Sequence, residues 1–199
     1  QTINEYDKIF ITDLCPEKEI LEELSKSNKL QGKVQVLDHH KTYENLKYTK
    51  YDFVKIKLKD NKGLCCGTSL FYEYLKENNY INSNPEIDEF VELTRQHDTW
   101  EWKNIYNNEK SRELAILFES LGYNGYIELI TEKLKQQNKY FEFSPLEQTL
   151  IKNRKKQIEE KCRIYETKVC YQEILGMKAG ILFIDYDYRN EIAEYFRQN

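Results

Sequence analysis

One carboxylate and two imidazoles follow directly on a short apolar stretch, in the run Val34-Gln35-Val36-Leu37-Asp38-His39-His40. Carboxylates and imidazoles are side chains that bind divalent cations and transfer protons. The chain holds 3 histidines, and the remaining one, His97, directly precedes another carboxylate, Asp98. This grouping favours metal-dependent chemistry over the alternative, in which Asp38 caps a turn and the histidines face solvent.

The elements that must position these residues form a strand, helix, strand succession. The stretch before Asp38 is typical of a strand buried on both faces of a parallel sheet. A second strand is predicted over Lys8–Thr12, ending at Asp13, and the helical spacing over Glu17–Ser25 completes a βαβ unit. Because right-handed crossovers bring the carboxyl ends of parallel strands to one edge, we expect Asp13 to lie near His39. The alternative for Asp13 is an N-cap or turn aspartate.

Two further helices are predicted to flank the sheet, over Gly67–Lys76 and Glu86–Gln96. The second ends close to Asp98, so this carboxylate is expected at a helix terminus. Trp100 and Trp102 follow; aromatic rings can stack on nucleotide bases, but tryptophans more often anchor a core, and packing is our prediction for both.

A capping box is predicted further along the chain, with Ser144 as N-cap, Pro145 in the first helical turn and Glu147 reaching back. A long helix should follow. Its basic run, residues 152–156, is interpreted as a solvated face rather than a phosphate site.

In their order and spacing, these motifs resemble those of the DHH phosphoesterases. The resemblance rests on Asp13 after the first strand, Asp38-His39-His40 after the second, Gly67-Thr68-Ser69-Leu70 opening a helix, and Arg95-Gln96-His97-Asp98-Thr99-Trp100. The family includes single-strand exonucleases, phosphodiesterases of short oligoribonucleotides and cyclic nucleotides, and polyphosphatase or pyrophosphatase relatives. Residues 99–103 look closest to the oligoribonuclease and cyclic-nucleotide branch.

The resemblance implies an α/β fold. A parallel-sheet domain with flanking helices would occupy residues 1–142, a long connecting helix residues 143–175, and the beginning of a second α/β lobe, which binds substrate, residues 176–199.

The resemblance also implies a role for each motif residue. Asp13, His39 and Asp98 would bind metal, with Asp13 bridging two Mn²⁺ ions; Mg²⁺ is the other candidate. His40 would face the scissile phosphate and Asp38 would orient the site, so these two are the candidate catalytic residues. Two cations about 3.5–4 Å apart can clamp a phosphoester and activate water, and oxygen and imidazole ligands suit Mn²⁺.

Two family motifs have no match here: the first metal motif, which supplies most ligands of the other ion, and the Gly-rich histidine motif of the C-terminal lobe. We therefore expect either an internal segment of a longer enzyme or a degenerate relative. The function implied is Mn²⁺-dependent hydrolysis of short oligoribonucleotides or cyclic nucleotides. The alternatives are a polyphosphatase or pyrophosphatase of the same superfamily and a non-catalytic nucleotide-binding module.

The composition bounds the partners. A formal net charge of −4, from 30 basic and 34 acidic residues, argues against a duplex-DNA reader and leaves room for a local groove that binds short RNA or nucleotides. No apolar run approaches the roughly 18–20 residues of a membrane span, so we expect a cytoplasmic protein. The 5 cysteines form no Cys-x-x-Cys pair, which argues against a disulfide framework or zinc ribbon. A homodimer is compatible with the sequence.

Overall fold

The computed structural model describes residues 5–27, 30, 32–44, 50–136, 138, 140–184 and 188–198. It divides into two compact units, each considered by itself. The sheet unit comprises Gln1–Ala115 and Ile127–Glu142, and the hairpin unit comprises Ile116–Tyr126 and Phe143–Asn199.

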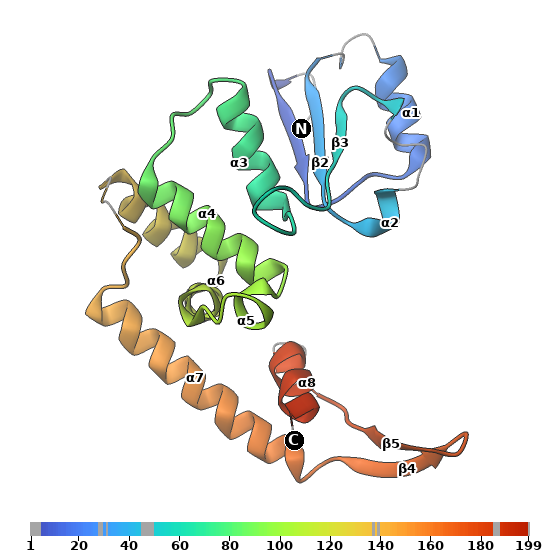
Figure 1. Ribbon diagram of the computed structural model, residues 1–199, viewed down its shortest axis with the longest axis vertical. Helices are drawn as coiled ribbons and strands as arrows, with labels where there is room; N and C mark the ends of the chain where they lie inside the picture. Colours follow the sequence, from blue (N-terminus) through green and yellow to red (C-terminus); the bar gives the residue numbers. More distant parts are fainter. Residues whose placement is uncertain are drawn as a thin grey trace. The chain divides into compact units, whose positions relative to one another are not determined.

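The sheet unit contains a parallel three-stranded sheet, in the order β1-β2-β3 (Figure 1). The strands are β1 (Ile9–Thr12), β2 (Val34–Asp38) and β3 (Val54–Ile56), and α1 (Lys18–Lys26) connects the first two. Thr12 is the register partner of Leu37, and Asp38 that of Ile56. The predicted βαβ unit is therefore confirmed, and β2 is the central strand of the sheet.

As predicted for an α/β fold, helices flank the sheet: α3 (Gly67–Glu77) packs on it, and α4 (Pro85–Asp98) packs on α3. The other helices of the unit are α2 (Lys41–Glu44), α5 (Glu101–Asn104) and α6 (Glu109–Lys135), the last of which contributes residues to both units. On one side Leu21 of α1 joins a cluster with Val36 and Val54. On the other, Phe71 and Tyr74 of α3 lie 5.0 and 5.5 Å from the ring of Phe10, between ring centroids.

The hairpin unit contains the long helix predicted after Ser144. Helix α7 (Pro145–Glu166) begins with the expected capping box: Ser144 Oγ accepts from the Glu147 N–H, and the Glu147 carboxylate accepts from the Ser144 N–H. An antiparallel hairpin of β4 (Cys170–Ile174) and β5 (Met177–Ile181) and the helix α8 (Arg189–Gln198) follow. Ile192 of α8 packs in a cluster with Ile158 of α7.

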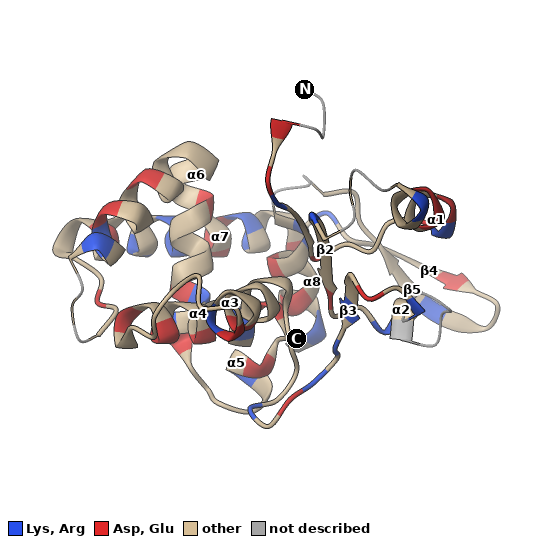
Figure 2. Cartoon of the chain, turned by 90° about the horizontal axis from the view of Figure 1, so that it is seen from above, with Lys and Arg blue, Asp and Glu red and all other residues tan. Residues whose placement is uncertain are grey.

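Charged residues of both signs are interspersed along the helices, and α1 shows this clearly in Figure 2. Of the basic run on α7, Arg154 donates to Glu119 and to Tyr188, whereas Lys152 and Lys156 are exposed. Among the helices that the structure describes, none combines the length and apolar character needed to cross a bilayer.

Candidate metal centre

The residues predicted to form the site lie at the carboxyl edge of the sheet. Asp13 directly follows β1, and its N–H donates to the Leu37 carbonyl at 3.0 Å, which extends the strand pairing by one residue. The backbone then turns sharply, because Asp13 has a left-handed φ of 63°. Gly67, the first residue of α3, lies against this turn: a Cβ on Gly67 would be 2.7 Å from the Asp13 Cβ. Only a glycine leaves room for Asp13 in this position.

The metal-binding candidates converge at this edge. Potential ligand atoms of Asp13, Asp38, His39 and His40 all lie within 4.8 Å of one another. His39 Nε2 is 2.8 Å from Asp13 Oδ1 and 3.5 Å from Asp98 Oδ2. Asp98, the last residue of α4, thus joins through His39 a cluster formed by residues at the ends of β1 and β2.

Asp38 is fully buried beneath the two histidines. Its Oδ1 accepts from the His39 N–H at 2.8 Å, from the His40 N–H at 3.3 Å and from His40 Nδ1 at 2.7 Å. The hydrogen bond that His40 donates to Asp38 raises the pKa of His40, burial opposes this effect, and the charges of Asp38, Asp13 and Asp98 raise the pKa further. This contact fixes the orientation of the His40 ring.

Asp98 is the last residue of α4, so the expectation of a helix-terminal carboxylate is met. Its side chain is 42% exposed and faces His39. Partial burial raises the pKa of the Asp98 carboxyl, Asp13 adds to this effect, and His39 and His40 counteract it.

The donor set fits a divalent cation. Asp13, His39 and Asp98 offer carboxylate oxygens and one imidazole nitrogen, which suit Mn²⁺ or Mg²⁺ better than thiolate-seeking metals. Asp38 Oδ2 is buried and has no hydrogen-bond partner among the described residues, so the cluster holds acceptor capacity that its own donors do not use. Asp38 supplies the carboxylate support that metal-site histidines commonly have.

The neighbouring cysteine is not equipped to act as a nucleophile. Burial, together with the nearby Asp38 charge, raises the pKa of the Cys15 thiol to about 11, so this thiol stays protonated at neutral pH. Cys65 and Cys66 are buried as well.

The two tryptophans differ in their surroundings. Trp102 is 7% exposed and belongs to the core, as predicted. Trp100 is 37% exposed and has a left-handed φ of 59°, a backbone conformation that a bulky side chain rarely adopts. The packing prediction holds for Trp102, whereas Trp100 presents an aromatic surface two residues beyond Asp98.

A buried ionic network that the sequence did not predict lies beside Asp98. Arg95 is 1% exposed and Glu101 5% exposed, and the two form an ion pair. Charged residues on a helix normally indicate a solvated face, so the residue types gave no sign of burial. The only feature of the sequence that pointed to a role for Arg95 and Glu101 was their nearness to Asp98.

The chain is 34% identical over 160 residues to oligoribonuclease NrnB of Bacillus subtilis (strain 168). The alignment covers 80% of this chain and 39% of that protein, so the matched region is well under half of the relative's length. Neither a protein-family model nor a solved structure matches the chain.

Proposed function

We propose that the chain belongs to the DHH phosphoesterases and carries part of the site of a Mn²⁺-dependent phosphodiesterase that hydrolyses short oligoribonucleotides, with cyclic nucleotides as the second substrate class. The observation that carries this proposal is the convergence of Asp13, His39 and Asp98 on one point, with His39 Nε2 2.8 Å from Asp13 and 3.5 Å from Asp98. The similarity to an oligoribonuclease supports the oligoribonucleotide substrate.

Each residue of the cluster has a role that follows from its contacts. Asp13, His39 and Asp98 would hold the metal; divalent cations bound there would neutralise phosphate charge and lower the pKa of water. Asp38 accepts from His40 Nδ1, which leaves Nε2 of the same ring for the phosphate. His40 is accordingly the substrate-binding and catalytic candidate, and Asp38 is the residue that orients it.

The test is Mn²⁺-dependent hydrolysis of a 5′-labelled diribonucleotide by the 199-residue chain. Asp98→Asn should abolish release of mononucleotide and leave the melting temperature near that of the wild type, because the side chain is partly exposed. Asp52→Asn, which changes an exposed aspartate of the same unit, is the matched control and should retain turnover. Repeating the assay with Mg²⁺ identifies the preferred ion.

Three outcomes contradict the proposal in different ways. Turnover retained by Asp98→Asn refutes the ligand assignment. A marked preference for pyrophosphate or inorganic polyphosphate over the diribonucleotide favours the polyphosphatase alternative. Binding of diribonucleotide without turnover, with one Mn²⁺ or none per chain, favours a non-catalytic nucleotide-binding module.

A further inference from the structure

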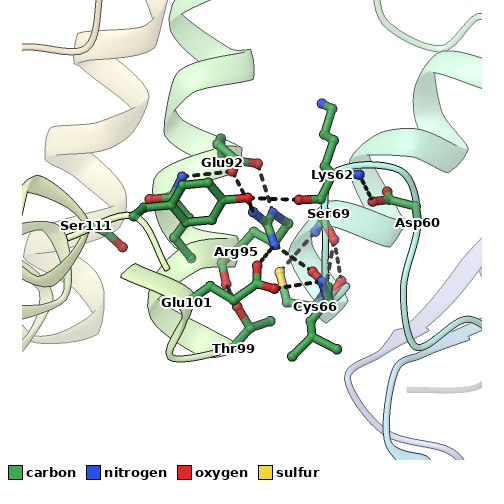
Figure 3. A network of polar contacts seen from close by, with 12 residues as sticks. Asp60, Lys62, Cys66, Ser69, Glu92, Arg95, Thr99, Glu101 and Ser111 are labelled. Atoms are coloured by element: carbon green, nitrogen blue, oxygen red, sulfur yellow. Dashed lines mark hydrogen bonds and ion pairs between the residues drawn. The ribbon is translucent and has the colours of Figure 1, made fainter. Parts of the chain in front are cut away.

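Arg95 is the largest fully buried side chain in the described part of the protein, at 1% exposure. Its Nε and Nη2 donate to the two carboxylate oxygens of Glu92 at 2.9 and 2.6 Å, and its Nη1 donates to Glu101. Figure 3 shows the guanidinium enclosed by these groups. Since its donors are engaged by neighbouring protein groups, Arg95 is placed to hold structure together rather than to bind substrate.

Arg95 and Glu101 both form hydrogen bonds with the backbone of a second segment of the chain, at Leu64. Arg95 Nη1 donates to the Leu64 carbonyl at 2.8 Å, and the Leu64 N–H donates to Glu101 Oε1 at 3.1 Å. A Cβ on the preceding Gly63 would lie 2.7 Å from the Glu101 carboxylate, so the loop backbone approaches the ion pair as closely as it can. Both backbone polar groups of Leu64 are thereby fixed.

That segment leads directly to the turn that holds Asp13. Cys66 caps α3, through Ser69 N–H to Cys66 Sγ at 3.3 Å and Cys66 N–H to Ser69 Oγ at 3.0 Å. The next residue, Gly67, lies against Asp13. The position of Leu64 therefore helps to determine the position of Gly67, the residue that lies against Asp13.

Arg95 itself belongs to the last turn of α4, which also carries Asp98. The Arg95 carbonyl accepts from the Thr99 N–H at 3.0 Å and from Thr99 Oγ1 at 2.8 Å, which closes the helix end around Asp98. Arg95 thus contacts both parts of the site. Its side chain contacts the segment that leads to Gly67 beside Asp13, and its backbone closes the helix turn that carries Asp98.

We propose that Arg95, paired with Glu101, is a positioning residue for the metal centre, holding the Asp98 turn and the segment behind Asp13 in the register that lets both carboxylates reach His39. This inference rests on the proposed function only in that the cluster must bind a divalent ion. Buried ion pairs are often no more stabilising than apolar side chains of similar volume. Positioning explains why a charged pair occupies this place.

The test measures Mn²⁺ binding by isothermal titration calorimetry together with the melting temperature. Arg95→Met should weaken Mn²⁺ binding about 10- to 100-fold, the range found when residues that orient metal ligands are changed. Arg95→Lys, which keeps the charge and loses the forked geometry, should give an intermediate loss and remains available if Arg95→Met does not fold. In the double variant Arg95→Met with Glu101→Met, the melting temperature should recover while Mn²⁺ binding stays weak.

Glu86→Gln is the matched control. Glu86 is also fully buried, lies at the opposite end of α4 and accepts from the Asn138 N–H at 2.8 Å. It should lower the melting temperature and leave Mn²⁺ affinity within about twofold of the wild type.

Two results with the variants would overturn the inference: wild-type Mn²⁺ affinity in folded Arg95→Met or Arg95→Lys, or recovery of both affinity and stability in the double variant. Diribonucleotide hydrolysis is assayed alongside. A wild type that binds Mn²⁺ without turnover would refute diribonucleotide hydrolysis by this chain, while the positioning role is still decided by the affinities. A wild type that binds no Mn²⁺ would overturn both.

Discussion

Gly67 and Asp13 are in direct contact, and the conformation of each depends on the other. A Cβ on Gly67 would lie 2.7 Å from the Asp13 Cβ, 3.0 Å from its backbone nitrogen and 3.1 Å from its Cα. Asp13 meanwhile has a φ of 63°, a conformation that costs a non-glycine residue of order 1 kcal/mol or more. The close approach of α3 holds Asp13 in this turn and directs its carboxylate to His39.

Gly67→Ala should therefore displace Asp13. The added methyl group meets Asp13 backbone and Cβ atoms rather than a flexible side-chain end, so the turn must move and Mn²⁺ affinity should fall about tenfold or more. Calorimetric titration of Mn²⁺ measures this. The control is Gly125→Ala, where the nearest atom to the new Cβ is Leu121 Cβ at 3.4 Å; it should leave affinity unchanged. Equal affinities in the two variants would show that Asp13 has no part in metal binding.

A second prediction concerns the way in which Asp38 acts through His40. Asp38→Asn keeps an acceptor near His40 Nδ1 and removes the charge that favours the observed 2.7 Å contact. We expect kcat for the diribonucleotide to fall about 10- to 100-fold. The double variant Asp38→Asn with His40→Ala should be no slower than His40→Ala alone, because the two residues act as one unit. If the fall in kcat of the double variant equals the product of the falls in the two single variants, Asp38 has a role independent of His40.

The sequence was sufficient to predict how the cluster assembles. Strand ends at Asp13 and Asp38, joined by a helical stretch, predict one sheet edge through the handedness of βαβ units, and the structure has His39 2.8 Å from Asp13. Helix-terminal placement of Asp98 and the capping box at Ser144 were also predictable, because they depend on local side-chain chemistry.

The features that escaped prediction depend on tertiary context. Helix α6 has 27 residues but contains Gly122 at a left-handed φ of 66°, so no single apolar face runs along it. Strand β4 is exposed at every position, which removes the alternation that identifies a strand. The burial of Arg95 and Glu101 depends on a partner loop 31 and 37 residues away from them in the chain.

A third prediction concerns Trp100, the exposed aromatic residue near Asp98. Base stacking on an aromatic ring contributes about 1–3 kcal/mol, so Trp100→Ala should raise KM for the diribonucleotide by about 5- to 150-fold and leave kcat and Mn²⁺ affinity near wild type. Trp100→Phe, which keeps an aromatic ring, should have a KM for the diribonucleotide close to that of the wild type. Steady-state kinetics at saturating Mn²⁺ separate these parameters. An unchanged KM in Trp100→Ala would mean that the exposed ring does not contact substrate.

The last prediction concerns Asp88, which joins α4 to the end of α3. Its carboxylate accepts from Ser83 Oγ at 2.8 Å and from Lys76 Nζ at 3.3 Å. Burial works to raise the pKa of Asp88, but the hydrogen bonds from Ser83 and Lys76 outweigh it, so the pKa lies below the ordinary value. The ionised form is therefore the one that stabilises the fold.

A carboxyl group whose pKa is lowered by folding stabilises the native state fully above its unfolded pKa, about 3.9 for aspartate, and loses that contribution as the pH falls through the folded pKa. Asp88→Asn should accordingly reduce the free energy of unfolding at pH 7, by less than about 1 kcal/mol because the pair with Lys76 is partly exposed. The gap between wild type and variant should close as the pH falls below about 4. Urea unfolding at several pH values, over the range in which both proteins fold, measures the gap; a gap that is constant with pH would show that the Asp88 charge contributes nothing to stability.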